Sequence, residues 1–141
     1  MISLQKYNEP YPIERIIASS TYLTAGGVGF VWLIIAAVLK KTVRPFLMYH
    51  IMQSIFLSIL YFLLTVIVNF LMIILLKIPF INLLIGKLVY FLIIPLPFIL
   101  NLSIIQAITS SIILYLAITA FMSYYSYIPW VSDIIRGNVG R

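Results

Sequence analysis

The sequence predicts an all-α integral membrane protein with four hydrophobic helices, of which three or four cross the bilayer completely. Apolar residues make up 64% of its 141 residues and charged residues only 9%, whereas an average soluble domain is about half apolar and about a quarter charged. The three acidic residues (Glu9, Glu14 and Asp133) all lie outside the long apolar runs. A soluble domain of this length could not bury so much apolar surface, because small domains leave a large fraction of their surface exposed.

The chain begins with a charged stretch followed by a long apolar run. Residues 1–15 carry four charges and two prolines, so we expect an irregular arm at the membrane interface. Residues 16–39 follow without a charge, and Lys40 and Lys41 end the run. At about 1.5 Å per residue, a helix over this run is ~36 Å long, which is enough to cross a hydrocarbon core of about 30 Å. We therefore expect the first membrane helix over residues 16–39.

A second helix is expected over residues 46–76. Residues 51–76 carry no charge, and Lys77 closes the run. Pro45 suits the first helical turn, because the N–H that proline lacks would have no partner in the helix at that position. This run is also longer than the hydrocarbon core requires, so we expect it to span the membrane.

The last apolar run is too long for a single span. Residues 88–132 contain no charge, and a straight helix of that length would measure ~68 Å, about twice the hydrocarbon core. Pro95 and Pro97 can break it, because proline removes a backbone donor and clashes with the preceding turn. We therefore expect a third helix over residues 80–99 and a fourth over residues 102–124.

Lys87 lies in the middle of the third segment, and two arrangements follow from it. Either the segment spans and the Lys87 ammonium reaches the interface along its aliphatic stem, or the segment dips into the bilayer and returns on the same side. The positive-inside rule does not decide between them, because the basic residues are divided too evenly. The four helices together form a transmembrane domain over residues 16–126, and residues 127–141 return to water as a polar C-terminal tail.

Small and polar residues in two of the expected helices indicate helix packing. Glycines are clustered in the first helix, and small side chains let helices approach closely in lipid. A polar series in the fourth helix recurs at three and four residues, so its members share one face and can either bond to a neighbouring helix or line a hydrophilic path. The candidate packing residues are Gly26, Gly27 and Gly29 in the first helix and Ser103, Gln106 and Ser110 in the fourth.

The composition offers little material for catalysis. No cysteine is present, which removes disulfides, thiolate metal sites and cysteine nucleophiles. His50 is the only histidine, and no carboxylate stands at ligand spacing from it, so we expect no metal, no cofactor and no enzymatic activity. The nine basic residues are scattered between apolar blocks, so we expect lipid headgroups rather than nucleic acid as their partners.

Two short segments resemble a known family. Residues 45–54 read PFLMYHIMQS at the start of the second helix, and residues 127–135 read YIPWVSDII after the last one. Together they resemble the family of the twenty-kilodalton subunit of the chloroplast inner-envelope import translocon, the Tic-twenty family, including its short bacterial relatives. The matching residues are Pro45, Phe46, Tyr49, His50 and Gln53 in the first segment and Ile128, Pro129, Val131 and Asp133 in the second.

The resemblance implies a function and a location. It implies a multi-pass membrane component of a protein-translocation channel, in a bacterial cytoplasmic membrane or a plastid envelope. Its partners would be the lipid bilayer, other membrane subunits or a second copy, and a translocating polypeptide. The alternative that stays open is a structural or assembly subunit of a larger membrane complex, with no transport activity of its own.

Two departures from the family pattern concern charge. Met48 stands where the family has an arginine, and Arg44, one turn earlier, can replace it. Ser58 stands where plant members carry an acidic residue within the helix. We hypothesise that the two motif segments pack together on one membrane face, with Asp133 reaching either Arg44 or a protonated His50.

Overall fold

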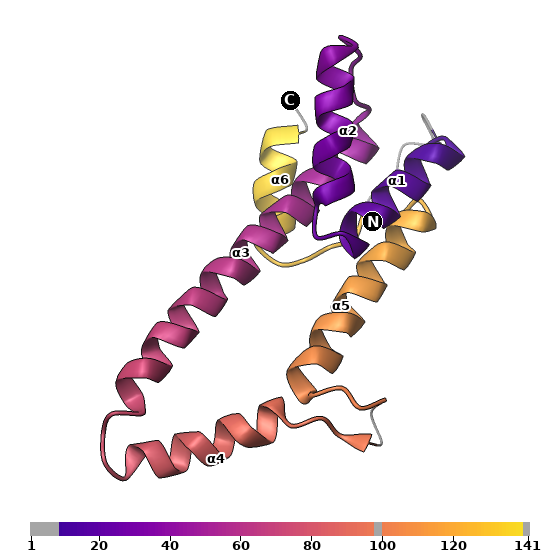
Figure 1. The fold of residues 1–141 in the computed structure, drawn as a ribbon. Helices are drawn as coiled ribbons and strands as arrows, with labels where there is room; N and C mark the ends of the chain where they lie inside the picture. The colour runs from indigo at the N-terminus through magenta and orange to yellow at the C-terminus, as the bar shows by residue number, and fades with distance from the viewer. Residues whose placement is uncertain (1–8, 98–99, 140–141) are drawn as a thin grey trace. The chain divides into compact units, whose positions relative to one another are not determined.

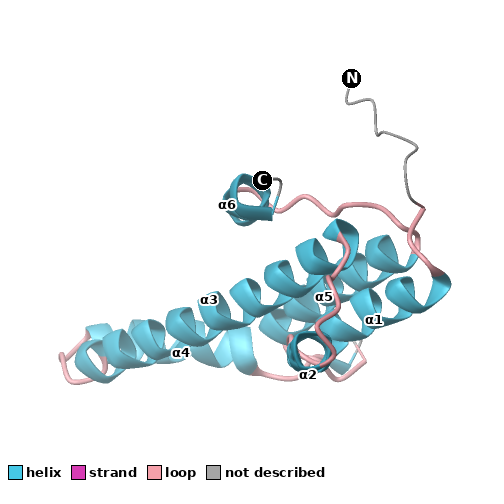
Figure 2. Ribbon diagram, turned by 90° about the horizontal axis from the view of Figure 1, so that it is seen from above, coloured by secondary structure: helices cyan, strands magenta, loops and turns pink. Residues whose placement is uncertain are grey.

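Every regular element in the described part of the chain is an α-helix. The computed structural model describes residues 9–97 and 100–139, in which the backbone forms no strand beyond an isolated bridge between Leu96 and Leu102. The helices are α1 (Pro12–Leu23), α2 (Gly27–Val38), α3 (Pro45–Leu75), α4 (Ile81–Ile93), α5 (Ile104–Phe121) and α6 (Val131–Val139), joined by loops (Figures 1 and 2). The predicted all-α class is therefore confirmed.

The described chain divides into two compact units. The first unit contains residues 9–58 and 114–139, and the second contains residues 59–97 and 100–113. Because α3 and α5 contribute residues to both, the first unit consists of α1, α2, the start of α3, the end of α5, and α6. Among the described residues, every side-chain hydrogen bond that joins distant parts of the sequence lies in this first unit.

Fewer helices than expected can cross a bilayer alone. The sequence predicts three or four complete spans, but of the described helices only α3, with 31 residues, and α5, with 18, are long and apolar enough. The expected first helix over residues 16–39 is wrong, because the chain breaks at Ala25 and Gly26, whose φ angles are 52° and 90°. Glycine adopts this left-handed conformation without a steric penalty, and the Gly26 N–H donates to the Thr21 carbonyl at 2.8 Å. α1 and α2 therefore have only 12 residues each.

The expected third helix over residues 80–99 is too long. α4 has 13 residues and ends at Ile93, while residues 98–99 lie outside the described part of the chain. Ile94 is already extended, with ψ at 132°, because the ring of Pro95 disfavours the helical conformation in the residue before it. With 13 residues, α4 is too short to span the bilayer by itself.

The other two expected helices are close to the observed ones. The helix expected over residues 46–76 is α3, which begins and ends one residue earlier. The helix expected over residues 102–124 is α5, which is two residues shorter at its start and three at its end. After α5 the chain turns at Ser123, whose φ is 68°. Long apolar runs thus locate these helices well, and local turns set their ends.

The amino-terminal arm expected over residues 1–15 is shorter than that. Residues 1–8 lie outside the described part, but α1 already begins at Pro12. Proline suits the first helical position, and the Glu14 carboxylate accepts a hydrogen bond from the Tyr11 N–H at 2.9 Å. This cap satisfies a donor that the first turn leaves unpaired.

The C-terminal tail expected over residues 127–141 is not simply polar. α6 occupies most of it, and residues 140–141 lie outside the described part. Val131 and Ile135, one turn apart, are buried against Tyr49 of α3, whereas Asp133 and Arg136 are exposed. An amphipathic helix therefore replaces the expected solvated segment.

The core of the first unit surrounds the start of α3. Leu47 and Ile51 are almost completely buried there, in contact with a cluster that includes Ala18 of α1 and Leu116 and Ala120 of α5. Small side chains allow these helices to pack closely. By contrast, no residue of α4 is buried, and none of the most apolar 18-residue window of α3 is buried either.

Gly29 marks the closest helix contact in this core. A Cβ added to Gly29 would lie 2.8 Å from Thr21 Cγ2 and 2.9 Å from Ile51 Cγ2, both of which belong to stiff β-branched side chains. We expect Gly29→Ala to destabilise the protein by about 1–3 kcal/mol through overpacking, measured as the free energy of unfolding in detergent micelles. Gly86→Ala, within α4 where nothing lies within 4 Å, is the matched control and should be neutral or stabilising. Equal effects of the two substitutions would contradict the close contact.

Candidate functional site

A group of polar side chains is buried at the start of α3. Tyr49, His50 and Gln53 belong to the first motif segment, and His50 and Gln53 are completely buried. They face one side of α3 because they are spaced three or four residues apart, with Tyr49 flanking that side. Three further buried side chains complete the group, which we name the Gln53 cluster; its members are Tyr22, Tyr49, His50, Gln53, Ser126 and Ser132.

Gln53 connects the cluster. Its Oε1 accepts hydrogen bonds from the Tyr22 hydroxyl at 2.6 Å and from Ser126 Oγ at 2.9 Å. Its Nε2 donates to the Ser126 carbonyl at 3.3 Å and to Ser132 Oγ at 3.2 Å. A carboxamide has two donor hydrogens and two acceptor lone pairs, so all four are used. One side chain therefore joins α1, α3, α6 and the loop between α5 and α6.

The segment before α6 is held to α3 by further bonds. The Tyr49 hydroxyl donates to the Ser126 carbonyl at 2.7 Å. Ser132 Oγ accepts the Ile128 N–H at 2.8 Å, and the Pro129 carbonyl accepts the Val131 N–H at 2.9 Å as α6 begins. These bonds shape the second motif segment where it meets the first.

His50 is enclosed by aromatic rings. Its Nδ1 lies 2.8 Å from the Tyr22 hydroxyl oxygen. The Phe46 ring meets it edge-on at 4.6 Å between centroids, and the Tyr125 ring stacks on it at 6.0 Å. The backbone of Tyr124 lies near the ring, but His50 Nε2 makes no hydrogen bond of ordinary geometry with any described residue. This enclosure excludes bulk water from the imidazole.

The two motif segments meet, but not through the charges expected. The expected contact of Asp133 with Arg44 or His50 is wrong, because the carboxylate of Asp133 is exposed and accepts the Tyr127 hydroxyl at 3.2 Å. This neighbouring negative charge raises the pKa of Tyr127, since it disfavours the phenolate. The two segments are joined instead by buried hydrogen bonds between neutral groups. Water competes less strongly for these bonds than for an exposed ion pair.

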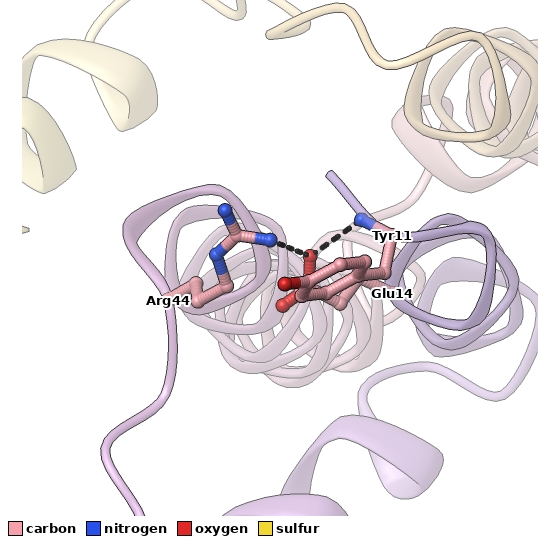
Figure 3. A network of polar contacts seen from close by, with 3 residues as sticks. All are labelled: Tyr11, Glu14 and Arg44. Atoms are coloured by element: carbon pink, nitrogen blue, oxygen red, sulfur yellow. Dashed lines mark hydrogen bonds and ion pairs between the residues drawn. The ribbon is translucent and has the colours of Figure 1, made fainter. Parts of the chain in front are cut away.

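Arg44 pairs with Glu14, 30 residues earlier in the chain, and not with Asp133. Its Nη1 lies 3.2 Å from Glu14 Oε2, which also accepts the Tyr11 N–H (Figure 3). The guanidinium carbon lies 4.6 Å from the centroid of the Tyr11 ring, a cation–π contact. Arg44 thus ties the loop between α2 and α3 to the start of α1.

The packing residues proposed in the first expected helix occupy different surroundings. Gly29 lies against Thr21 and Ile51, and a Cβ on Gly26 would lie 3.0 Å from the side chain of Ile55. A Cβ on Gly27 would meet only Thr24, at 3.7 Å. Two of the three glycines are therefore at contacts between helices of this chain.

The polar series proposed in the fourth expected helix works locally. The Gln106 N–H donates to Ser103 Oγ at 3.2 Å, and Gln106 Oε1 accepts the Ser103 N–H at 3.0 Å. This reciprocal pair is a capping box at the start of α5, and Ser110 is exposed further along the helix. Ser103 and Gln106 therefore cap the start of α5 instead of joining it to another helix.

Sequence reasoning missed several members of the site. Tyr22 and Ser126 have no local motif, and Ser132 lies in the second motif segment without being one of its matching residues. Only their positions in the folded chain bring them to Gln53. Glu14 carried a usable signal, because an acidic residue three positions after the residue preceding a helix commonly caps it. No three His, Asp or Glu side chains gather within the described ranges at a spacing suited to a metal ion.

The Tyr22 hydroxyl tests the importance of the Gln53 cluster. Tyr22→Phe removes a donor to Gln53 and leaves His50 Nδ1 without its buried partner. We expect a loss of about 1–3 kcal/mol in the free energy of unfolding, the usual cost of an unsatisfied buried polar group, measured by denaturant titration in micelles. Tyr61→Phe, at an exposed tyrosine of α3, is the control. A loss no larger than that of the control would show that the cluster contributes nothing to stability.

The pairing of Arg44 is tested by two double-mutant cycles. Glu14→Gln and Arg44→Gln should be non-additive in unfolding free energy, with a coupling of about 0.5–1 kcal/mol because the pair is partly exposed. Arg44→Gln and Asp133→Asn should be additive, since these side chains have different partners. Coupling in the second cycle and additivity in the first would reverse the assignment.

The chain was compared with protein-family models, curated proteins and solved structures. No protein-family model, no curated protein and no solved structure matches the chain. A proposal about function therefore depends on the two segments that resemble the Tic-twenty family and on the contacts between their residues.

Proposed function

We propose that the chain is a multi-pass integral membrane protein that serves as a component of a protein-translocation apparatus. The observation that carries this proposal is the position of the two segments that resemble the Tic-twenty family. Gln53 in the first and Ser132 in the second are 79 residues apart in sequence, yet their side chains are hydrogen bonded in a buried cluster. Two motifs that meet in one structural feature support a resemblance better than two isolated matches.

Membrane insertion is supported by the exposed apolar helices. α3 is about 46 Å long at 1.5 Å per residue, which compares with about 40–45 Å for a bilayer including its headgroups. Arg44 and Lys77 flank it, and the most apolar window between them has no buried residue. Phe80 and Leu84 are also largely exposed, at 92% and 71%. Contiguous apolar surface of this extent marks contact with lipid or another protein.

The multi-pass arrangement follows from four apolar helices of unequal length. α3 and α5 are each long and apolar enough to cross the bilayer, whereas α2 and α4 are apolar but shorter. In this arrangement α2 and α4 enter the membrane without completing a span on their own. Because α3 and α5 contain no acidic residue, transport through a relay of buried carboxylates is not part of the proposal.

The alternative role as an assembly subunit has less support. It uses the glycine cluster and the serine face of the fourth expected helix as docking surfaces. Gly26 and Gly29 already contact Ile55 and Ile51 of the same chain, whereas Ser110 is exposed. The exposed apolar faces of α3 and α5 remain available to lipid, partner subunits or an unfolded polypeptide.

Photo-crosslinking from α3 and α5 tests the function. A photoreactive residue replacing Phe62 or Leu114, both exposed, should crosslink to a precursor polypeptide arrested during transit in native membranes. The same probe replacing buried Leu47 is the control and should crosslink only within the chain. Crosslinks to the stable subunits of one complex, with none to precursor, would favour the assembly role.

Membrane placement is checked in the same preparation. The chain has no native cysteine, so Thr42→Cys and Lys77→Cys each supply a single thiol at opposite ends of α3. They should react with an impermeant reagent from opposite sides of the membrane. Labelling of both from one side would remove the proposed span whatever the crosslinking shows.

A further inference from the structure

We propose that a pocket beside the loop between α2 and α3 binds the phosphate group of an anionic phospholipid. The inference depends on the membrane placement proposed above, but not on the translocation role. The pocket has a volume of about 170 Å³ and lies in the first unit. Its wall combines charged side chains from the loop and from α1 with apolar side chains from α2 and α3. The lining residues include Glu14, Trp32, Leu39, Lys41, Thr42 and Arg44.

The polar side of the pocket has an excess positive charge. Two cations, Lys41 and Arg44, and one carboxylate, Glu14, line it. Glu14 Oε2 is already held by Arg44 Nη1 and the Tyr11 N–H (Figure 3). Within the described chain the Arg44 guanidinium makes one hydrogen bond, to Glu14, which leaves its other N–H groups unused, and the Lys41 ammonium has no hydrogen-bond or ion-pair partner. Arginine and lysine are the side chains that phosphate oxygens bind best.

The start of α3 adds to the positive electrostatic potential of the pocket. Pro45 has no N–H, and the amide hydrogens of Phe46 and Leu47 in the same turn have no acceptor among the described residues; Met48 makes the first backbone bond, to the Arg44 carbonyl at 2.9 Å. The unpaired amides and the aligned peptide dipoles of a long helix produce a positive end. Arg44 and Leu47, at this end, both line the pocket.

The apolar side of the pocket argues for a lipid over a free anion. Trp32 and Leu39 line it, and Ile35 both lines it and is 42% exposed on the outer surface of α2. A free phosphate would leave this wall in contact with water, whereas the glycerol and upper acyl groups of a phospholipid would cover it. The volume of about 170 Å³ corresponds to roughly six water molecules, which suits a phosphate with part of the glycerol.

The loop is also where lipid phosphates would be. Lys40 and Lys41 end one apolar helix, and Arg44 precedes another. In the proposed membrane placement this loop lies in the headgroup layer, where basic residues attract anionic lipids. Pocket shape, charge and position therefore agree on one occupant.

Lipid titration of the purified, delipidated full chain tests the site. Native mass spectrometry in detergent should show tighter binding of phosphatidylglycerol than of phosphatidylcholine. Lys41→Gln should weaken phosphatidylglycerol binding about fivefold, the effect of one cation near a lipid surface, because Lys41 holds no other group of the protein. Lys40→Gln removes the same charge one residue away, outside the pocket wall, and should weaken it much less. Equal losses in both variants would show attraction by general surface charge and overturn the site.

A second variant tests the pocket without changing charge. Leu39→Trp enlarges a lining side chain that is 58% exposed, so the protein can accommodate it, and an unchanged unfolding temperature verifies that it does. We expect the preference for phosphatidylglycerol over phosphatidylcholine to fall at least fivefold. Retained preference in this variant would contradict binding in the pocket, and displacement of bound phosphatidylglycerol by millimolar inorganic phosphate would overturn the lipid as occupant.

The readout separates this site from the proposed function. Lipid preference lost in Lys41→Gln, with no precursor crosslinks from α3 or α5, supports the site and rejects translocation. Precursor crosslinks together with no phosphatidylglycerol preference reject the site and leave translocation supported.

Discussion

The carboxamide of Gln53 is the interaction on which the first unit depends. It is completely buried, and its two donors and two acceptors are all paired with groups from α1, from α6 and from the loop before α6. A buried amide that lost these partners would cost several times what one ordinary hydrogen bond contributes. The segments that supply them are therefore held in one arrangement, and Tyr49 and His50 are positioned by the same contacts.

Polar and apolar groups are distributed opposite to their arrangement in a water-soluble domain. The first unit buries the polar side chains of His50, Gln53, Ser54, Ser126 and Ser132, whereas α4 and the most apolar part of α3 bury no residue. In lipid this pattern is favourable, because exposed apolar groups lose nothing there and internal polar groups are satisfied by one another. The fold thus supports insertion through its interior as much as through its surface.

Three charged residues, Glu14, Lys41 and Arg44, lie together beside the loop between α2 and α3. Arg44 neutralises Glu14, which itself caps α1, so a single ion pair closes the start of the chain onto the loop between α2 and α3. Lys41 beside this pair is left with an unneutralised charge. In the proposed lipid site this surplus charge lies next to an apolar wall, as an amphiphilic anion requires. The Asp133 carboxylate accepts a hydrogen bond from Tyr127 instead.

The sequence by itself determined the helical class and most of α3. A long charge-free run with Pro45 at its start and Lys77 at its end defines a helix from local information alone. The helix expected over residues 80–99 runs past Pro95, although proline restricts the residue before it whatever surrounds it, and α4 ends at Ile93. The break at Gly26 was not predictable in this way, since glycine in an apolar run is compatible both with a close-packed continuous helix and with a left-handed turn. Only the contacts of Gly26 and Gly29 with α3 and α1 select the turn.

Tertiary structure alone decided which polar groups meet. Tyr22, Ser126 and Ser132 reach Gln53 because α1 and α6 pack on the same side of α3, and nothing in the neighbouring residues encodes that pairing. The partner of Arg44 was mispredicted for the same reason: with three carboxylates available, distance in the folded chain selects Glu14 over Asp133. Neighbours in sequence set the backbone conformation at Pro45 and Pro95, whereas neighbours in space set the turn at Gly26 and the pairing of the polar side chains.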